Sequence, residues 1–144
     1  MYLNYIRRER TAWFVHFSLA LAILLCVSRA NAMERFAALS MLESGDDDFA
    51  LGKYLEISRY QIRPGVWQQV TSVPVCQATN SVVALGVAQA VAAKCCQDFE
   101  RLHGRPPTDF EFYVMWNAPA QIDNPSRAVR ERAKRFANLV HKRD

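Results

Sequence analysis

Hydrophobic side chains recur at helical spacing over residues 33–43. Phe36, Leu39 and Glu43 lie one or two turns apart, so one face of a helix carries apolar side chains and ends on an acid. Gly45 follows, and glycine is common at the left-handed position that ends a helix. The pattern predicts a helix whose last turn holds Glu43, on or beside the inward face.

The next segments change period and polarity. Residues 46–53 are polar and turn-like, whereas residues 54–62 partly alternate and contain tyrosine and isoleucine, which predicts a short strand region. Pro64 predicts a short helix to Val70, because proline fits a first helical turn. Residues 71–79 are predicted to form a loop.

A long apolar segment follows. Asn80 is a suitable cap for a helix that runs to about His103. Between Val82 and Ala93 the only polar side chain is Gln89, so this helix is apolar on most sides. Such a helix is expected at the centre of a small fold.

Two helices complete the chain. Thr108 and Glu111 form a capping-box pattern, which predicts a helix to Asn117, although periodicity alone would also allow a strand over residues 110–116. A last helix is predicted over residues 124–142. The order of elements predicts a mainly α, α+β domain: compact and helical, with one small β-hairpin region near its beginning.

The first 32 residues predict a targeting segment. Three arginines precede an apolar run over residues 13–27, and Ala30 and Ala32 fit a small-residue cleavage pattern. We expect a signal peptide over residues 1–32 and one domain over residues 33–144, exported to the periplasm or secreted. The alternative is a retained anchor in the inner membrane, although about fifteen apolar residues are short for a span of about twenty.

Without this segment the charge is nearly balanced. It contains four arginines and one glutamate, so the net charge falls from +4 to +1. Residues 125–144 carry seven Lys or Arg against two acids. This basic helix predicts either a solvated face or weak contact with an anionic membrane surface. Aromatic residues are not interleaved there beyond Phe136, which argues against nucleic-acid binding.

The cysteines predict one disulfide or small core side chains rather than a metal site. An oxidising compartment would permit one disulfide, between Cys76 and either Cys95 or Cys96, although such residues also serve as small core side chains. There is no Cys-x-x-Cys pattern, and the segment after residue 32 has two histidines, His103 and His141. We expect no metal and no cofactor.

The position of Glu43 suggests acid chemistry. A carboxyl group at a helix C-terminus meets the negative end of the backbone dipole, and apolar neighbours disfavour its ionised form. Both effects raise the pKa, and a carboxyl group protonated near neutral pH is a general acid. The alternative is a glutamate that points into water.

Three motifs in order resemble the soluble lytic transglycosylases and their goose-type lysozyme relatives. They are Glu43-Ser-Gly45, then Ser58-Arg-Tyr-Gln-Ile62 with Pro64 and Trp67, then Trp116-Asn-Ala-Pro119. That family shows Glu-Ser-Gly at a helix end, then Gly-Leu-Met-Gln-Ile, then Tyr-Asn-Ala-Gly. The resemblance spans roughly residues 33–139 and implies a lysozyme-like fold.

The resemblance implies roles for individual residues. Glu43 matches the catalytic acid/base, Ser44 the residue that helps to position it, Gln61 a groove-lining glutamine and Asn117 the substrate-side asparagine. Tyr60 and Trp116 are the preferred groove residues, because they lie inside the matched motifs. The aromatic candidates for sugar stacking or for the core are Tyr54, Tyr60, Trp67, Tyr113 and Trp116. Ser58, Trp116 and Pro119 depart from the family's glycine, tyrosine and glycine. The serine side chain and the stiffer proline would narrow the groove.

The implied substrate is the glycan strand of peptidoglycan, cut between N-acetylmuramic acid and N-acetylglucosamine. In a transglycosylase Glu43 would protonate the bridging oxygen and then deprotonate the muramic C6 hydroxyl. Glu56 is a second candidate, because an inverting glycosidase places a second carboxylate about 6.5–9.5 Å from the acid to activate water. Alternatively Glu56 is exposed or pairs with Arg59 or Arg63. We expect a monomeric cell-wall enzyme or, alternatively, a weak or inactive sugar-binding accessory protein of the same fold.

Overall fold

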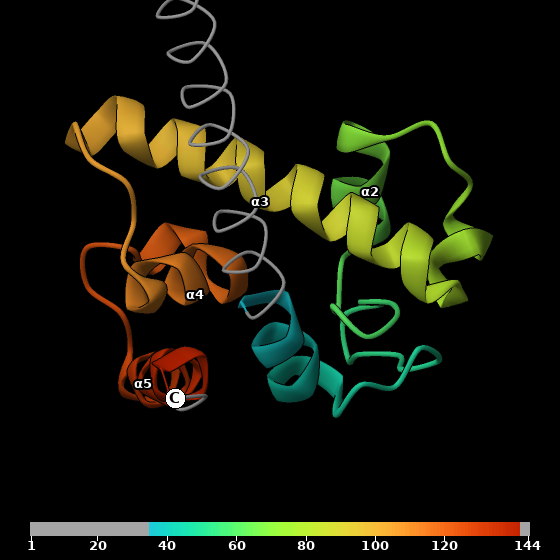
Figure 1. The fold of residues 1–144 in the computed structure, drawn as a ribbon, viewed down its shortest axis with the longest axis horizontal. Helices are drawn as coiled ribbons and strands as arrows, with labels where there is room; N and C mark the ends of the chain where they lie inside the picture. Colours follow the sequence, from blue (N-terminus) through green and yellow to red (C-terminus); the bar gives the residue numbers. More distant parts are fainter. Residues whose placement is uncertain (1–34, 142–144) are drawn as a thin grey trace, which may run out of the picture. The chain divides into compact units, whose positions relative to one another are not determined.

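The computed structural model describes residues 35–141, so the predicted signal peptide or anchor lies outside the described residues. These residues are mainly helical, which confirms the mainly α part of the predicted class. A first helix covers residues 35–44. It is followed by α2 (Pro64–Val70), the 3-10 helix η1 (Val75–Thr79), α3 (Ser81–His103), α4 (Asp109–Asn117), the 3-10 helix η2 (Pro119–Gln121) and α5 (Arg127–His141) (Figure 1).

Three predicted helix ends are confirmed. The Asn80 side chain accepts hydrogen bonds from two backbone N–H groups at the start of α3. Thr108 and Glu111 form the complete capping box of α4. Gly45 ends the first helix with a φ of 70°, and its N–H bonds to the carbonyl of Met41.

The start of the last helix differs from the prediction. α5 begins at Arg127, not at Asn124. The Ser126 side chain accepts a 3.4 Å hydrogen bond from the N–H of Val129, so Ser126 provides the cap. Its predicted end at Lys142 lies outside the described residues.

The predicted β-hairpin region is not formed. Over residues 51–62 there are two isolated antiparallel bridges, Leu51–Ile57 and Ile57–Ile62, within a series of turns. Ser58 and Gln61 have φ values of 61° and 50°, which turn the backbone out of the extended conformation. The partial alternation of side chains predicted a strand over residues 54–62. The left-handed residues Ser58 and Gln61 interrupt the extended backbone, so no strand forms there.

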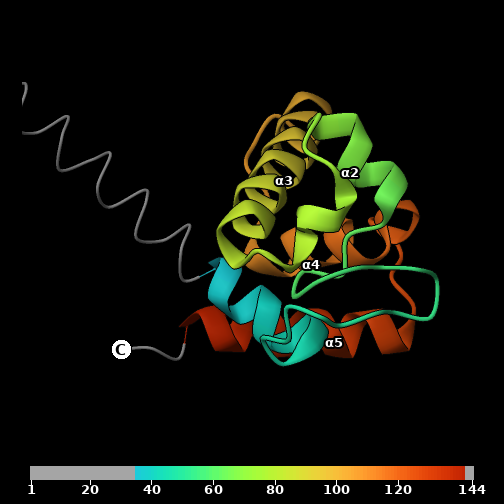
Figure 2. The same ribbon diagram turned by 90° about the vertical axis from the view of Figure 1, so that its right-hand side faces the viewer.

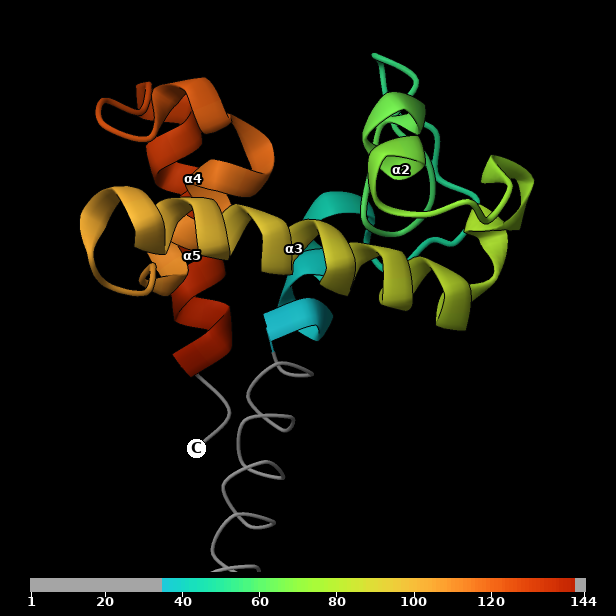
Figure 3. The same ribbon diagram turned by 90° about the horizontal axis from the view of Figure 1, so that it is seen from above.

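The long helix α3 does not lie at the centre of the fold. One face is buried through Ala84, Val87, Ala88, Val91, Ala92 and Phe99, and the opposite face is exposed, including Val82 at 77%. Figures 1 and 3 show α4 near one half of α3 and α2 near the other. By length and composition α3 could cross a membrane, a property that core helices of soluble proteins share.

An aromatic core connects the last two helices to the first. Phe136 of α5 stacks on Phe112 of α4 at 5.6 Å between ring centroids and packs against Tyr113 at 5.3 Å. Phe36 meets Phe112 edge-on at 6.3 Å. Figures 1 and 2 show the first helix beside α5. This packing holds the end of the first helix, and hence Glu43, against α4 and α5.

The predicted disulfide is absent, and all three cysteines of the described part are free. Cys76 lies in η1 before α3 begins, whereas Cys95 lies roughly 20 Å along α3 from its first residue at about 1.5 Å of rise per residue. A disulfide requires Cα atoms within about 7 Å. The length of α3 therefore separates the cysteines. Cys95 and Cys96 pack against the core instead.

Candidate active site

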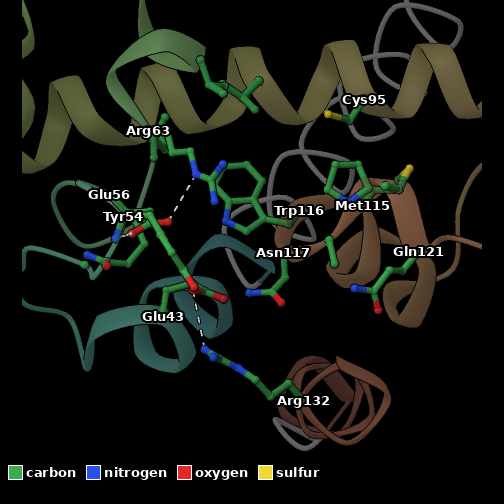
Figure 4. Close-up of a pocket in the computed structure, with 18 of the residues that line it drawn as sticks. Glu43, Tyr54, Glu56, Arg63, Cys95, Met115, Trp116, Asn117, Gln121 and Arg132 are labelled. Atoms are coloured by element: carbon green, nitrogen blue, oxygen red, sulfur yellow. Dashed lines mark hydrogen bonds and ion pairs between the residues drawn. The ribbon is translucent and has the colours of Figure 1, made fainter. Parts of the chain in front are cut away.

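A pocket of about 690 Å³ opens between the turns of residues 52–63, the middle of α3 and the end of α4. Its walls combine polar groups, carboxylates and amides, with apolar and aromatic surface, as small-molecule sites do. Figure 4 shows these side chains directed into one space. The predicted residues that line it are Glu43, Glu56, Gln61, Trp116 and Asn117.

Glu43 lies in the last turn of the first helix, as predicted, and its side chain is only 7% exposed. Its Oε1 atom accepts a 2.6 Å hydrogen bond from the hydroxyl of Tyr113. Its Oε2 atom lies 3.6 Å from a terminal nitrogen of Arg132. One oxygen is thus held tightly on the α4 side, and the other makes a longer ion pair at the pocket (Figure 4).

The surroundings of Glu43 favour its neutral form. Burial raises the pKa of Glu43 above its usual value, and this effect outweighs the opposing hydrogen bond from Tyr113 and the charge of Arg132. The negative charge of Glu56 raises the pKa of Glu43 slightly further. Burial and the same carboxylate also raise the pKa of Tyr113, so its hydroxyl keeps the proton that it donates. The site can therefore hold a protonated carboxyl group in a pocket.

Glu56 lies on the same pocket in a different environment. Its Oε2 atom accepts a 2.8 Å hydrogen bond from the backbone N–H of Tyr54, and its Oε1 atom accepts a 3.3 Å bond from Arg63. Burial raises the pKa of Glu56, but these hydrogen bonds and the charge of Arg63 lower it by more. The two carboxyl groups thus have pKa values displaced in opposite directions. This is the pattern of a neutral acid beside an ionised carboxylate.

Gln61 is fixed by the turns rather than free in the pocket. Its amide nitrogen donates to the carbonyl oxygens of Ser58 at 2.9 Å and Ala50 at 3.4 Å. A Cβ atom at Gly52 would collide with the side chains of Gln61 and Glu56. Gly52 therefore permits the close approach that forms this wall.

Trp116 and Asn117 line the pocket at the end of α4. The indole N–H of Trp116 donates a 3.3 Å hydrogen bond to the carbonyl oxygen of Tyr60, which orients the ring. Asn117 is exposed, and Figure 4 shows its amide directed into the same space as Glu43. Both therefore remain candidates for substrate contact.

Two predicted residues do not line the pocket. Tyr60 is 4% exposed and packs edge-on against Phe36 at 6.1 Å, so it is a core residue rather than a stacking surface. The hydroxyl of Ser44 donates a 3.0 Å hydrogen bond to the carbonyl of Arg59 and accepts one from the N–H of Asp47. Ser44 therefore ties the turns to the end of the first helix, beside Glu43.

Three residues at the site have a larger role than the sequence patterns predict. Tyr54, passed over in favour of Tyr60, is 64% exposed and lines the pocket between Lys53 and Arg63. Tyr113 was placed among the aromatic candidates without its bond to Glu43. Arg132 was read only as part of a basic helix face.

A signal for Arg132 exists in its spacing. It lies four residues before the buried Phe136 and next to the buried Ala133, at the edge of the packed face of α5. A cation at such an edge reaches groups on the neighbouring helix. Here it reaches Glu43.

Among residues 35–141 no cluster of three or more His, Cys, Asp or Glu is arranged to hold a metal ion. No family model matches the chain, and no curated protein or solved structure matches it significantly. The resemblance to lytic transglycosylases therefore stays a prediction from the motifs.

Proposed function

We propose that this protein is an exported, lysozyme-like enzyme that cleaves the bond between N-acetylmuramic acid and N-acetylglucosamine in peptidoglycan. The observation that carries the proposal is the environment of Glu43. A carboxyl group that is 7% exposed, with a pKa raised by burial, faces a pocket large enough for sugar rings. Cleavage of a glycosidic bond needs such an acid, because the departing oxygen must be protonated.

The hydrogen bonds suggest which oxygen of Glu43 acts. Tyr113 donates to Oε1, so the proton of the neutral carboxyl group is carried by Oε2, the oxygen nearer to Arg132. In the proposed first step Oε2–H protonates the bridging oxygen, and the glycosidic bond breaks. The resulting Glu43 carboxylate then accepts the proton of the muramic C6 hydroxyl as that oxygen closes an intramolecular anhydro ring.

The environment of Glu56 favours this transglycosylase outcome over hydrolysis. A base that activates water must be basic enough to accept a proton from it. Glu56 instead accepts bonds from Tyr54 and Arg63, and its pKa is lowered. We therefore assign Glu56 to the structure and charge of the pocket rather than to activation of water.

One departure from the family pattern also supports the resemblance. Ser58 stands where the family has glycine, and it adopts a φ of 61°, a conformation that glycine adopts without strain. A shared backbone turn would account for both the glycine of the family and the strained serine here. The lysozyme-like fold is proposed on this ground and on the order of the motifs.

A second candidate is a cell-wall binding protein with little or no turnover. The observation that favours it is Arg132, whose charge opposes protonation of Glu43. Such a protein would bind glycan strands through the pocket without cutting them, and Glu43→Gln would leave binding unchanged.

The test is loss of turbidity of purified cell walls on adding the purified protein. Clearing is expected with the wild type and should fall at least about 100-fold in Glu43→Gln, because general acid catalysis typically contributes that much or more. Glu100→Gln, which changes the same chemical group on the exposed side of α3, should clear as the wild type does. Clearing that survives Glu43→Gln would overturn the proposal.

A further inference from the structure

Arg132 is held weakly for a residue that lies beside a buried acid. Its guanidinium makes a 3.6 Å ion pair with Glu43 and a 3.4 Å hydrogen bond to the carbonyl of Leu42, and it lies 6.0 Å from the ring centroid of Tyr113. Strong charge-assisted bonds to arginine are about 2.7–2.9 Å long, often in pairs. The side chain is 43% exposed and lines the pocket. It therefore has donors left for a ligand.

The charges around the pocket favour an anion. Arg132 projects from α5, and Lys53 and Arg63 line the turns. Of these cations, Arg63 pairs with Glu56 at 3.3 Å, whereas the one carboxylate that Arg132 contacts, Glu43, lies at 3.6 Å. The charged or titratable groups that act on Glu43 are Arg132 from α5, Tyr113 from α4 and Glu56 from the turns. A neutral Glu43 leaves the pocket with three cations and one anion.

We propose, on the basis of the function proposed above, that Arg132 binds a carboxylate of the glycan strand and in doing so leaves Glu43. Arg132 would thus make the enzyme specific for carboxylate-bearing glycans and couple binding to protonation of the acid. In the free enzyme the guanidinium opposes protonation of Oε2 by its charge. Once it pairs with the substrate carboxylate, that opposition is neutralised, and Glu43 takes up the proton that the reaction needs.

Arg132 can move to a ligand without displacing the carboxyl group of Glu43. Tyr113 keeps Oε1 in place through its 2.6 Å bond, so movement of Arg132 does not release the carboxyl group. The hydrogen bond from Arg132 to the carbonyl of Leu42 is 3.4 Å long, so little is lost when the guanidinium turns to a ligand. Arg132 is a binding residue for substrate and a positioning residue for the proton of Glu43.

Two kinds of carboxylate have the required chemistry: the lactyl group of muramic acid, which is free only where the stem peptide has been removed, and the acids of the stem peptide itself. Three substrates separate them: strands with their peptides, peptide-free strands with the lactyl carboxylate, and peptide-free strands with that carboxylate converted to an amide. We expect kcat/KM to be at least about tenfold lower on the amidated strands, the size of one charge-assisted hydrogen bond. Peptide-free strands cleaved better than intact ones identify the lactyl group, whose carboxylate is free only after the peptide is removed. A preference for intact strands identifies the acids of the peptide.

Variants identify the side chain. Arg132→Gln should cleave all three substrates with similar kcat/KM, whereas Arg132→Lys should keep most of the preference. Arg135→Gln is the matched control: it removes the same charge from an exposed position of α5 outside the pocket, and the preference should be unchanged. A preference that persists in Arg132→Gln would overturn the inference and leave the proposed function standing. Failure of the wild type to cut any strand would overturn the proposed function itself.

The pH profile of the wild type tests the coupling without a variant. Activity is lost as pH rises and Glu43 gives up its proton, and kcat/KM reports the free enzyme whereas kcat reports the complex. On carboxylate-bearing strands the alkaline limb of kcat should lie at higher pH than that of kcat/KM. On amidated strands the two limbs should coincide. Coincident limbs on both substrates would overturn the inference.

Discussion

The hydroxyl of Tyr113 donates a 2.6 Å hydrogen bond to the carboxylate of Glu43, which lies seventy positions earlier in the chain. Tyr113 of α4 is fully buried and packs against Phe136 of α5, so its hydroxyl is a rigid donor. The bond fixes one oxygen of the acid and directs the other to the pocket. The orientation of the Glu43 carboxyl group therefore depends on the hydrogen bond from Tyr113.

Tyr113→Phe should therefore lower the free energy of unfolding and raise the pKa of Glu43. Loss of the hydroxyl leaves a buried carboxyl oxygen unpaired, which we expect to cost about 1–3 kcal/mol in the free energy of unfolding. The pKa of Glu43 should rise, because the hydrogen bond that lowers it is gone. Urea denaturation at pH 7 measures the first effect, and the alkaline limb of kcat/KM, moved to higher pH, measures the second. An unchanged limb would show that the bond does not tune the acid.

Glu43→Gln should show a stability difference that depends on pH. Because burial raises the pKa of Glu43 above its ordinary value of 4.5, the folded state binds this proton more tightly than the unfolded state. That stabilisation is complete below pH 4.5 and is lost as pH rises through the raised pKa. The variant should therefore gain stability relative to the wild type between pH 4 and pH 7. Urea titrations at both values measure the difference, and Glu100→Gln serves as the comparison.

Gly52→Ala should damage the pocket more than the fold. The added Cβ meets the ends of the Glu56 and Gln61 side chains, which must move away from their hydrogen bonds. We expect at least about a tenfold fall in kcat/KM, since small displacements of site residues have large kinetic effects. Gly86→Ala, at an exposed position of α3 with open space around it, should instead stabilise the protein by about 0.5–1 kcal/mol. Equal activity in both variants would contradict the assigned role of Gly52.

Ser58→Gly should stabilise the turns before α2. Ser58 is 3% exposed at a φ of 61°, and its hydroxyl has no hydrogen-bond partner among the described residues. Glycine removes both the left-handed strain, worth roughly 1–2 kcal/mol, and the unpaired hydroxyl, against a smaller entropic loss. We expect a rise of about 1 kcal/mol in the free energy of unfolding. Ser58→Ala removes the hydroxyl but keeps the strain, so thermal denaturation should rank it below the glycine variant.

The sequence predicts helix ends correctly where residues close in the chain determine them. The cap of α3 at Asn80, the capping box of α4 and the stop at Gly45 each depend on a side chain or a glycine within a few residues. The failed strand has an equally local cause. Ser58 and Gln61 adopt left-handed conformations, which neither residue type predicts.

The site was predicted where motifs carried it and missed where distant elements supply it. Glu43, Gln61 and Asn117 line the pocket, as expected from their motifs. The contacts of Glu43 come from Tyr113 and Arg132, on helices far along the chain, and no spacing rule connects them. The motif favours Tyr60 over Tyr54 as a groove residue. Tertiary packing, which no motif encodes, buries Tyr60 and leaves Tyr54 exposed.

The most direct measurement is mass spectrometry of the fragments that the protein releases from purified peptidoglycan. The wild type should yield glycan strands that end in anhydro-muramic acid, and Glu43→Gln should yield none above background. Strands with ordinary reducing ends would contradict the proposed ring closure. Identical products from the wild type and the variant would show that the proton of Glu43 is not what breaks the bond.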